Sequence, residues 1–116
     1  MKLRIKGDAL RLRLSRTEVT RLVKVGSVTE VIHFAPGSSL EYSVSVGREL
    51  GVTYAANHIA ITLSAEEVRA WATSDQDGIY GEAGGALTVT VEKDFACLDR
   101  TDAENADMSP NPKAMC

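Results

Sequence analysis

The sequence contains one pattern twice, and this internal repeat constrains the fold more than any other feature. Residues 2–47 and 50–94 align as two copies of one unit, and residues 10–19 match residues 59–68 at a constant offset of 49. A later stretch matches at an offset of 47, which predicts a loop two residues shorter in the second copy. The matched pairs there are Ile32 with Ile79, Gly37 with Gly84, Leu40 with Leu87 and Val44 with Val91. Two copies are fewer than the three or so that a solenoid needs, so we expect a closed domain with pseudo-twofold symmetry.

Each copy begins with a predicted β-hairpin. In the first copy apolar residues alternate with charged ones in residues 2–6 and 10–14, on either side of a turn at Gly7 and Asp8. Strict alternation is typical of strands that bury one face and expose the other. The second copy keeps the apolar positions of this pattern.

A short helix is predicted after each of these hairpins. Ser15 stands three residues before Glu18, and Ser64 three before Glu67, which is the spacing of a capping box at a helix start. The residues expected on the buried helix faces are Val19, Leu22 and Val23 in the first copy and Val68 and Trp71 in the second. We expect Trp71 to fill the core position that Leu22 fills in the other copy.

A second hairpin is predicted to close each copy, because apolar runs flank turn residues there. The predicted strands are residues 28–34 and 40–46 in the first copy, and residues 79–82 and 87–91 in the second. The predicted fold class is α+β, an internally duplicated ββαββ unit with eight mainly antiparallel strands, two short helices and pseudo-twofold symmetry.

The composition fits one globular domain with a short extension. The chain has 116 residues, of which 44% are hydrophobic and 25% charged. We expect a duplicated domain over residues 1–95 and an acidic, proline-containing arm over residues 96–116. No apolar run approaches the 18 or so residues of a membrane span, and the first residues do not resemble a signal peptide, so we expect a cytoplasmic protein without membrane contact.

The chain also resembles a family of small uncharacterised bacterial proteins. The residues that carry the resemblance are 92–100 (EKDFACLDR), Pro110-Asn111-Pro112, 1–7 (MKLRIKG) and 10–15 (LRLRLS). The resemblance covers nearly the whole chain and implies a bacterial, single-domain protein. It implies no activity, ligand or partner.

Charge is distributed unevenly along the chain. Residues 1–25 hold eight Lys and Arg against two acids, whereas residues 26–116 hold five against fourteen. The alternation predicts that five cations share the solvent face of the first hairpin. We call these residues the basic strip: Lys2, Arg4, Lys6, Arg11 and Arg13.

Two interpretations of the basic strip remain open. It is either a solvated face whose charges prevent strand aggregation, or a binding face for an anionic partner. Nucleic acid is the less favoured partner, because the net charge of the chain is −3 and the hairpin has no aromatic residue for base stacking. The chain's own acidic residues 99–107 are a closer candidate.

Signals for catalysis are weak. The sequence has none of the common phosphate-binding, zinc-protease or serine-hydrolase motifs, and neither a metal site nor a cofactor is predicted. Cys97 and Cys116 form a candidate thiol site, although the acids beside Cys97 would raise the pKa of its thiol and disfavour the reactive thiolate. The function that we expect is a non-catalytic binding or adaptor module that uses the basic hairpin face and the acidic arm. The alternative is a small thiol-dependent enzyme or modified carrier centred on Cys97 or Cys116.

Overall fold

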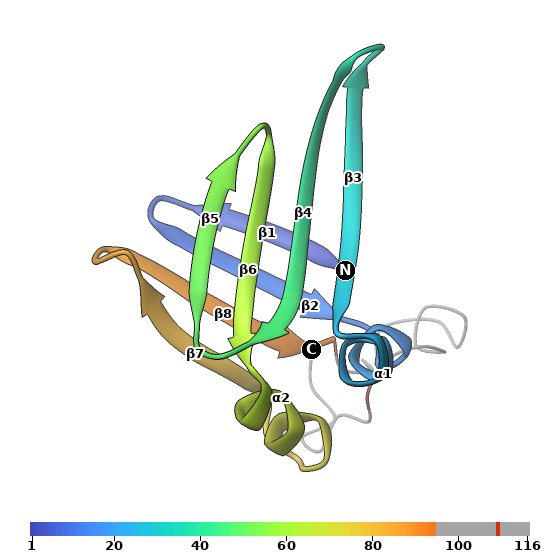
Figure 1. The fold of residues 1–116 in the computed structure, drawn as a ribbon, viewed down its shortest axis with the longest axis vertical. Coiled ribbons are helices and arrows are strands. Elements are labelled where there is room, and N and C mark those ends of the chain that lie inside the picture. Colours follow the sequence, from blue (N-terminus) through green and yellow to red (C-terminus); the bar gives the residue numbers. More distant parts are fainter. Residues whose placement is uncertain (95–108, 110–116) are drawn as a thin grey trace, which may run out of the picture.

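The computed structural model describes residues 1–94 and Ser109. Within these residues the chain forms eight strands and two helices, which confirms the predicted α+β class (Figure 1). The elements in chain order are β1 (Lys2–Lys6), β2 (Ala9–Leu14), α1 (Arg16–Val25), β3 (Ser27–Ala35), β4 (Ser38–Gly47), β5 (Gly51–Ala55), β6 (His58–Ser64), α2 (Ala65–Ala72), β7 (Gly78–Ala83) and β8 (Leu87–Lys93). The predicted arm over residues 96–116 lies outside the described residues except for Ser109.

The strands form two four-stranded sheets, and each sheet combines hairpins from both copies. Sheet A has the order β1-β2-β8-β7, and sheet B has the order β3-β4-β6-β5. The hairpins are antiparallel, whereas the central pairs β2/β8 and β4/β6 are parallel. The first hairpin of each copy therefore pairs with the last hairpin of the other. A pseudo-twofold axis that relates the two copies exchanges the two sheets.

The pairing register follows the sequence repeat. Leu12 stands opposite Val91 at the centre of sheet A, and Ile61 stands opposite Val44 at the centre of sheet B. Adding 49 to Leu12 gives Ile61, and adding 47 to Val44 gives Val91. The two parallel junctions are thus equivalent by the offsets that the sequence predicts, which supports the internal duplication.

One part of the sequence alignment is wrong. Val28 stands opposite Val44, and Ile79 stands opposite Val91, so the structural equivalent of Ile79 is Val28 and not Ile32. Burial agrees, because Val28 and Ile79 are each 3% exposed whereas Ile32 is 45% exposed. The loop after the helix is therefore two residues longer in the second copy, and the following hairpin is four residues shorter. Together these changes make this part of the second copy two residues shorter, and the sequence alone shows only this net difference.

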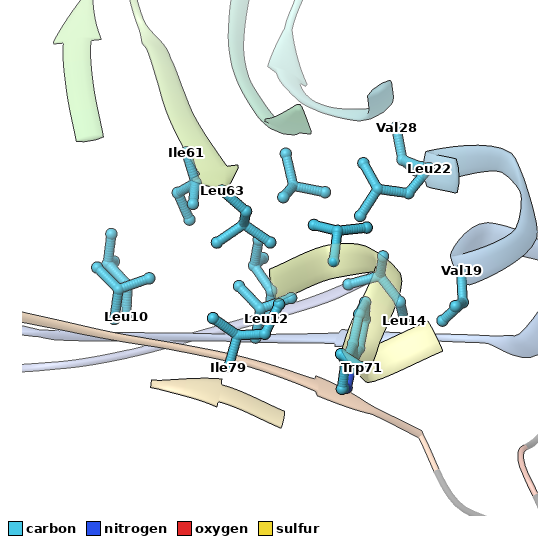
Figure 2. Packing of buried hydrophobic residues seen from close by; sticks show 14 of the residues in the cluster. Leu10, Leu12, Leu14, Val19, Leu22, Val28, Ile61, Leu63, Trp71 and Ile79 are labelled. Carbon is cyan, nitrogen blue, oxygen red and sulfur yellow. The ribbon is translucent and has the colours of Figure 1, made fainter. Parts of the chain in front are cut away.

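The core lies between the sheets, which the two helices close at one end (Figures 1 and 2). Leu22 of α1 and Trp71 of α2 are both fully buried, as expected for equivalent core positions. The Trp71 indole also satisfies its polar atom, since Nε1 donates a hydrogen bond to the Asp77 carbonyl at 3.1 Å. None of the described helices is both long and apolar enough to cross a membrane.

Both predicted helix caps are present. The Ser15 hydroxyl accepts a hydrogen bond from the Glu18 amide at 3.3 Å, and the Glu18 carboxylate accepts one from the Ser15 amide at 2.9 Å. The Ser64 hydroxyl accepts from the Glu67 amide at 3.2 Å. Both serines therefore act as helix caps; the predicted capping box is complete at Ser15, whereas at Ser64 only the contact of the serine side chain is present.

Candidate anion-binding face

The outer face of sheet A carries the basic strip. Side chains alternate across a strand, so the leucines of β1 and β2 point toward the core while the cations between them point to solvent. The strand register places Arg4 opposite Arg11, and Arg11 opposite Thr90. On the same face Lys2 stands opposite Arg13, and Lys6 lies at the end of the row that contains Thr88. The structure therefore gathers all five predicted cations on one face of one sheet.

Three of these cations already have a carboxylate partner. Arg11 and Arg13 both contact Oε1 of Glu92, with Nε at 3.4 Å and 3.0 Å respectively. The Nζ atom of Lys2 lies 2.8 Å from Oδ2 of Asp94. These carboxylates belong to β8 and the residue that follows it. The partner predicted from the sequence, residues 99–107, lies outside the described residues.

The other two cations, Arg4 and Lys6, make no ion pair with any residue that the structure describes. They border a hollow of about 290 Å³ on the sheet surface. Its lining consists of Arg4, Lys6, Ala9, Leu10, Arg11, Thr88 and Thr90. The lining side chains offer two guanidinium groups, one ammonium group and the Thr90 hydroxyl, whereas the Thr88 hydroxyl donates to the Asp8 carbonyl at 3.4 Å; none of them is a carboxylate. Such a set of donors suits an anion, and guanidinium forks in particular match the oxygen pairs of phosphate and carboxylate groups.

Sequence reasoning missed the residues that β7 and β8 add to this face, among them Tyr80. Tyr80 of β7 stands opposite Thr90, so it extends the row of Arg4 and Arg11, and its side chain is 62% exposed. Burial raises the pKa of the Tyr80 phenol, as do the charges of Glu92 and Asp77, while Arg11 acts in the opposite direction. The phenol therefore stays protonated at neutral pH and can donate a hydrogen bond. The alternation of Ile79 and Tyr80 predicts an outward tyrosine, but only the strand order shows that it shares a face with β1.

The outer face of sheet B has a different character. The positions equivalent to the basic strip hold Gly51, Thr53, Ala55, Ala60 and Thr62, in register with serine and threonine residues of β4 and β3. Small uncharged side chains cover most of this face. It offers no cluster of cations among the described residues.

Sheet B does contain one group of polar residues, formed by Ser43, His58 and Glu41. The Ser43 Oγ atom lies 2.8 Å from Nε2 of His58, and Oε2 of Glu41 lies 3.3 Å from the same nitrogen. A catalytic triad needs the serine and the acid on different ring nitrogens, so that the acid orients the ring while the other nitrogen accepts the proton. Ser43 is also buried. The arrangement is therefore a polar contact across the β4/β6 junction and not a nucleophile with its base.

The candidate thiol site of Cys97 and Cys116 lies outside the described residues. Within the described part of the chain, no group of three or more His, Cys, Asp or Glu residues is placed to hold a metal ion.

A comparison with protein families places the chain. The model of a family of unknown function, DUF7009, matches residues 1–113. The chain belongs to this family. The match spans both copies of the repeat, and it confirms the resemblance to an uncharacterised family that the sequence shows. Searches of curated proteins and of solved structures each gave no match.

Proposed function

We propose that this member of DUF7009 is a non-catalytic binding module, bacterial and cytoplasmic, that holds an anionic ligand on the outer face of sheet A. One observation carries the proposal. Arg4 and Lys6 are the two strip cations without a carboxylate partner among the described residues, and both border the hollow between β1, β2 and β8. Cations that only prevent strand pairing need no shared hollow, so this placement favours a binding face over a solvated one.

The geometry favours a compact group with several charges, such as a phosphate ester. Arg4 and Lys6 come from β1, Arg11 from β2 and Thr90 from β8, so donors from three neighbouring strands border the hollow. Strands hold these donors more rigidly than loops would, which lowers the ordering cost of binding.

Arg11 can also contact the bound anion, because its carboxylate partner Glu92 is shared with Arg13. Glu92 Oε1 accepts contacts from both Arg11 and Arg13, and the Arg13 contact is the shorter of the two. Arg11 can turn toward a bound anion while Arg13 continues to neutralise Glu92. The face therefore gains a third cation without leaving a carboxylate unpaired, which would cost more than the new contact contributes.

Long nucleic acid remains the less favoured ligand. The net charge of −3 opposes the accumulation of a polyanion, and Tyr80 is the one aromatic side chain on this face in the described residues. Binding to a single-stranded nucleic acid usually combines a continuous basic groove with several stacking residues.

Calorimetric titration of the full chain with pyrophosphate at low salt tests the proposal. We expect saturable binding that weakens as salt rises, because exposed charges are screened. The change of Arg4→Gln or Lys6→Gln should raise the Kd at least about tenfold, since a hydrogen bond to a charged group contributes roughly 1.5–3 kcal/mol. Arg48→Gln is the matched control, because it removes the same charge from an exposed position between β4 and β5. Unchanged binding in the Arg4 and Lys6 variants, or an equal loss in the control, would refute the proposal.

A further inference from the structure

The first copy carries an extended hairpin that its counterpart lacks. We call residues 31–40, which include the end of β3, the turn and the start of β4, the β3–β4 arm. It extends well beyond the rest of both sheets (Figure 1). The arm exposes large apolar side chains, namely Val31, Ile32 and Phe34, the last of which is 66% exposed. The equivalent β7/β8 hairpin is four residues shorter, so the pairing of the two sheets does not require the extension.

The arm also presents a free strand edge, because β3 is the outer strand of sheet B. The amide of Val46 donates to the carbonyl of Gly26 at 2.9 Å, and these two residues are opposite one another by the β3/β4 register. Hydrogen-bonded pairs recur at every second residue of an antiparallel ladder. The residues between them, which include Thr29, Val31 and His33, therefore direct their backbone N–H and C=O groups away from β4.

The arm lacks the charges and the short length that protect the other edge strands, and its edge is interrupted only by the register shift between His33 and Ala35. Lys2, Arg4 and Lys6 place charges along the edge strand β1, and β5 and β7 have five and six residues against nine in β3. Charges and short length are common means of preventing edge-to-edge pairing. Residues 31–40 contain no Lys, Arg, Asp or Glu.

We infer that β3 of one molecule pairs antiparallel with β3 of a second copy of this chain about a twofold axis. The two B sheets then form one sheet of eight strands. The uncharged arm favours this occupant, since a twofold axis through the arm sets uncharged residues of one copy opposite uncharged residues of the other, whereas like charges along the edge would repel. Val28 and Ile32 lie on one face of β3 with Glu30 between them, and antiparallel pairing brings the apolar side chains of both molecules to the same face of the joint sheet. Sheet A takes no part in the contact, so the inference is independent of the anion-binding proposal.

Sedimentation velocity on the full chain, over a range of concentrations, tests the inference. We expect a reversible shift from the 12.5 kDa mass of the chain to twice that mass. Phe34→Lys places two like charges in the contact and should raise the dimer Kd at least about tenfold. Tyr54→Lys is the matched control, because Tyr54 is a large side chain, 65% exposed, on the other edge strand of sheet B; it should leave the dimer unchanged.

Val31→Pro gives a second test that acts on the backbone. Proline at this position removes an outward N–H group and leaves the hydrogen bonds to β4 in place, which edge strands tolerate. We expect a monomer with an unchanged circular dichroism spectrum. The inference is overturned if the wild type stays monomeric at high concentration, forms open-ended assemblies, or dimerises equally in the Phe34→Lys and Val31→Pro variants.

Discussion

The two sheets are related by symmetry, yet their outer faces are not alike. Their inner faces share the same apolar positions, and Leu12 and Ile61 are both fully buried at the two parallel junctions. Outside, sheet A carries five cations where sheet B carries small uncharged residues. The core must stay symmetric because both sheets and both helices pack into it. The outer faces have no such constraint and differ freely, and the proposed anion-binding function rests on this difference.

The two copies also differ in the contacts of the residue that precedes their first strand. Met1 and Leu50 precede equivalent strands, and Glu30 is equivalent to Gly81 by the corrected register. The Met1 amine contacts the carboxylates of Glu18 at 2.6 Å and Glu30 at 3.1 Å. In the other half Leu50 packs so closely on Gly81 that an added Cβ would lie 2.3 Å from Leu50 Cδ2. The first copy therefore makes ion pairs at this position, and the second copy makes an apolar contact.

The largest effect should come from the core, where the halves are most alike. Trp71→Ala should lower the free energy of unfolding by about 3–5 kcal/mol, and Leu22→Ala by about 2–5 kcal/mol, because each leaves a cavity at a fully buried site. Urea unfolding of both variants measures these costs. A cost below about 1 kcal/mol for either one would show that the two sites are not equivalent parts of a common core.

The helix caps should give a smaller effect. Ser15→Ala and Ser64→Ala should each lower the free energy of unfolding by about 0.5–2 kcal/mol and leave anion binding unchanged. We expect the Ser15 change to cost at least as much, because it also disrupts the reciprocal contact of Glu18. Loss of pyrophosphate binding at unchanged stability would contradict a purely structural role for these serines.

The ion pairs of Met1 should add a pH dependence to the first half alone. Burial lowers the pKa of the Met1 amine, but the hydrogen bonds and charges of Glu18 and Glu30 outweigh it, so the pKa is raised above 8.0. The folded state then holds the proton more tightly than the unfolded state. This contribution to stability is fully present below pH 8.0 and is lost as the pH rises through the folded pKa.

Urea unfolding between about pH 7 and pH 9.5 measures this effect, which we expect to be the smallest of the three. Glu30→Gln should flatten the decrease in stability with pH. The control is Glu82→Gln, which removes an exposed carboxylate from β7 in the other half. An equal slope in the wild type and in the Glu30 variant would show that Glu30 does not raise the pKa of the amine.

Alternation and capping signals predict the elements well, because they depend on residues close together in sequence. Strand alternation and the pairs Ser15–Glu18 and Ser64–Glu67 suffice to predict the order of strands and helices. The order of the strands in the sheets cannot be predicted in this way. The same alternation is satisfied whether a hairpin pairs with a hairpin of its own copy or of the other copy. Without that order the sequence cannot show that Tyr80 joins the basic face, or that Glu92 neutralises two of its cations.

The corrected alignment has a similar cause. The offset of 47 at Ile32 is the sum of two opposite changes in length, a longer loop and a shorter hairpin in the second copy. The sequence shows only this sum. Ile32 and Ile79 therefore match in chemistry although one is exposed on the arm and the other lies in the core. The extended arm becomes visible only when the partners of Val28 and Ile79 are known.

The most direct test of the difference between the faces is a titration of the isotope-labelled chain with pyrophosphate, followed by backbone amide NMR. We predict progressive shifts of Arg4, Lys6, Arg11, Thr88 and Thr90 in sheet A. The equivalent face of sheet B should remain unchanged at the same concentrations. Equal shifts on both faces, or shifts confined to sheet B, would contradict the claim that the first hairpin and β8 form the anion-binding face.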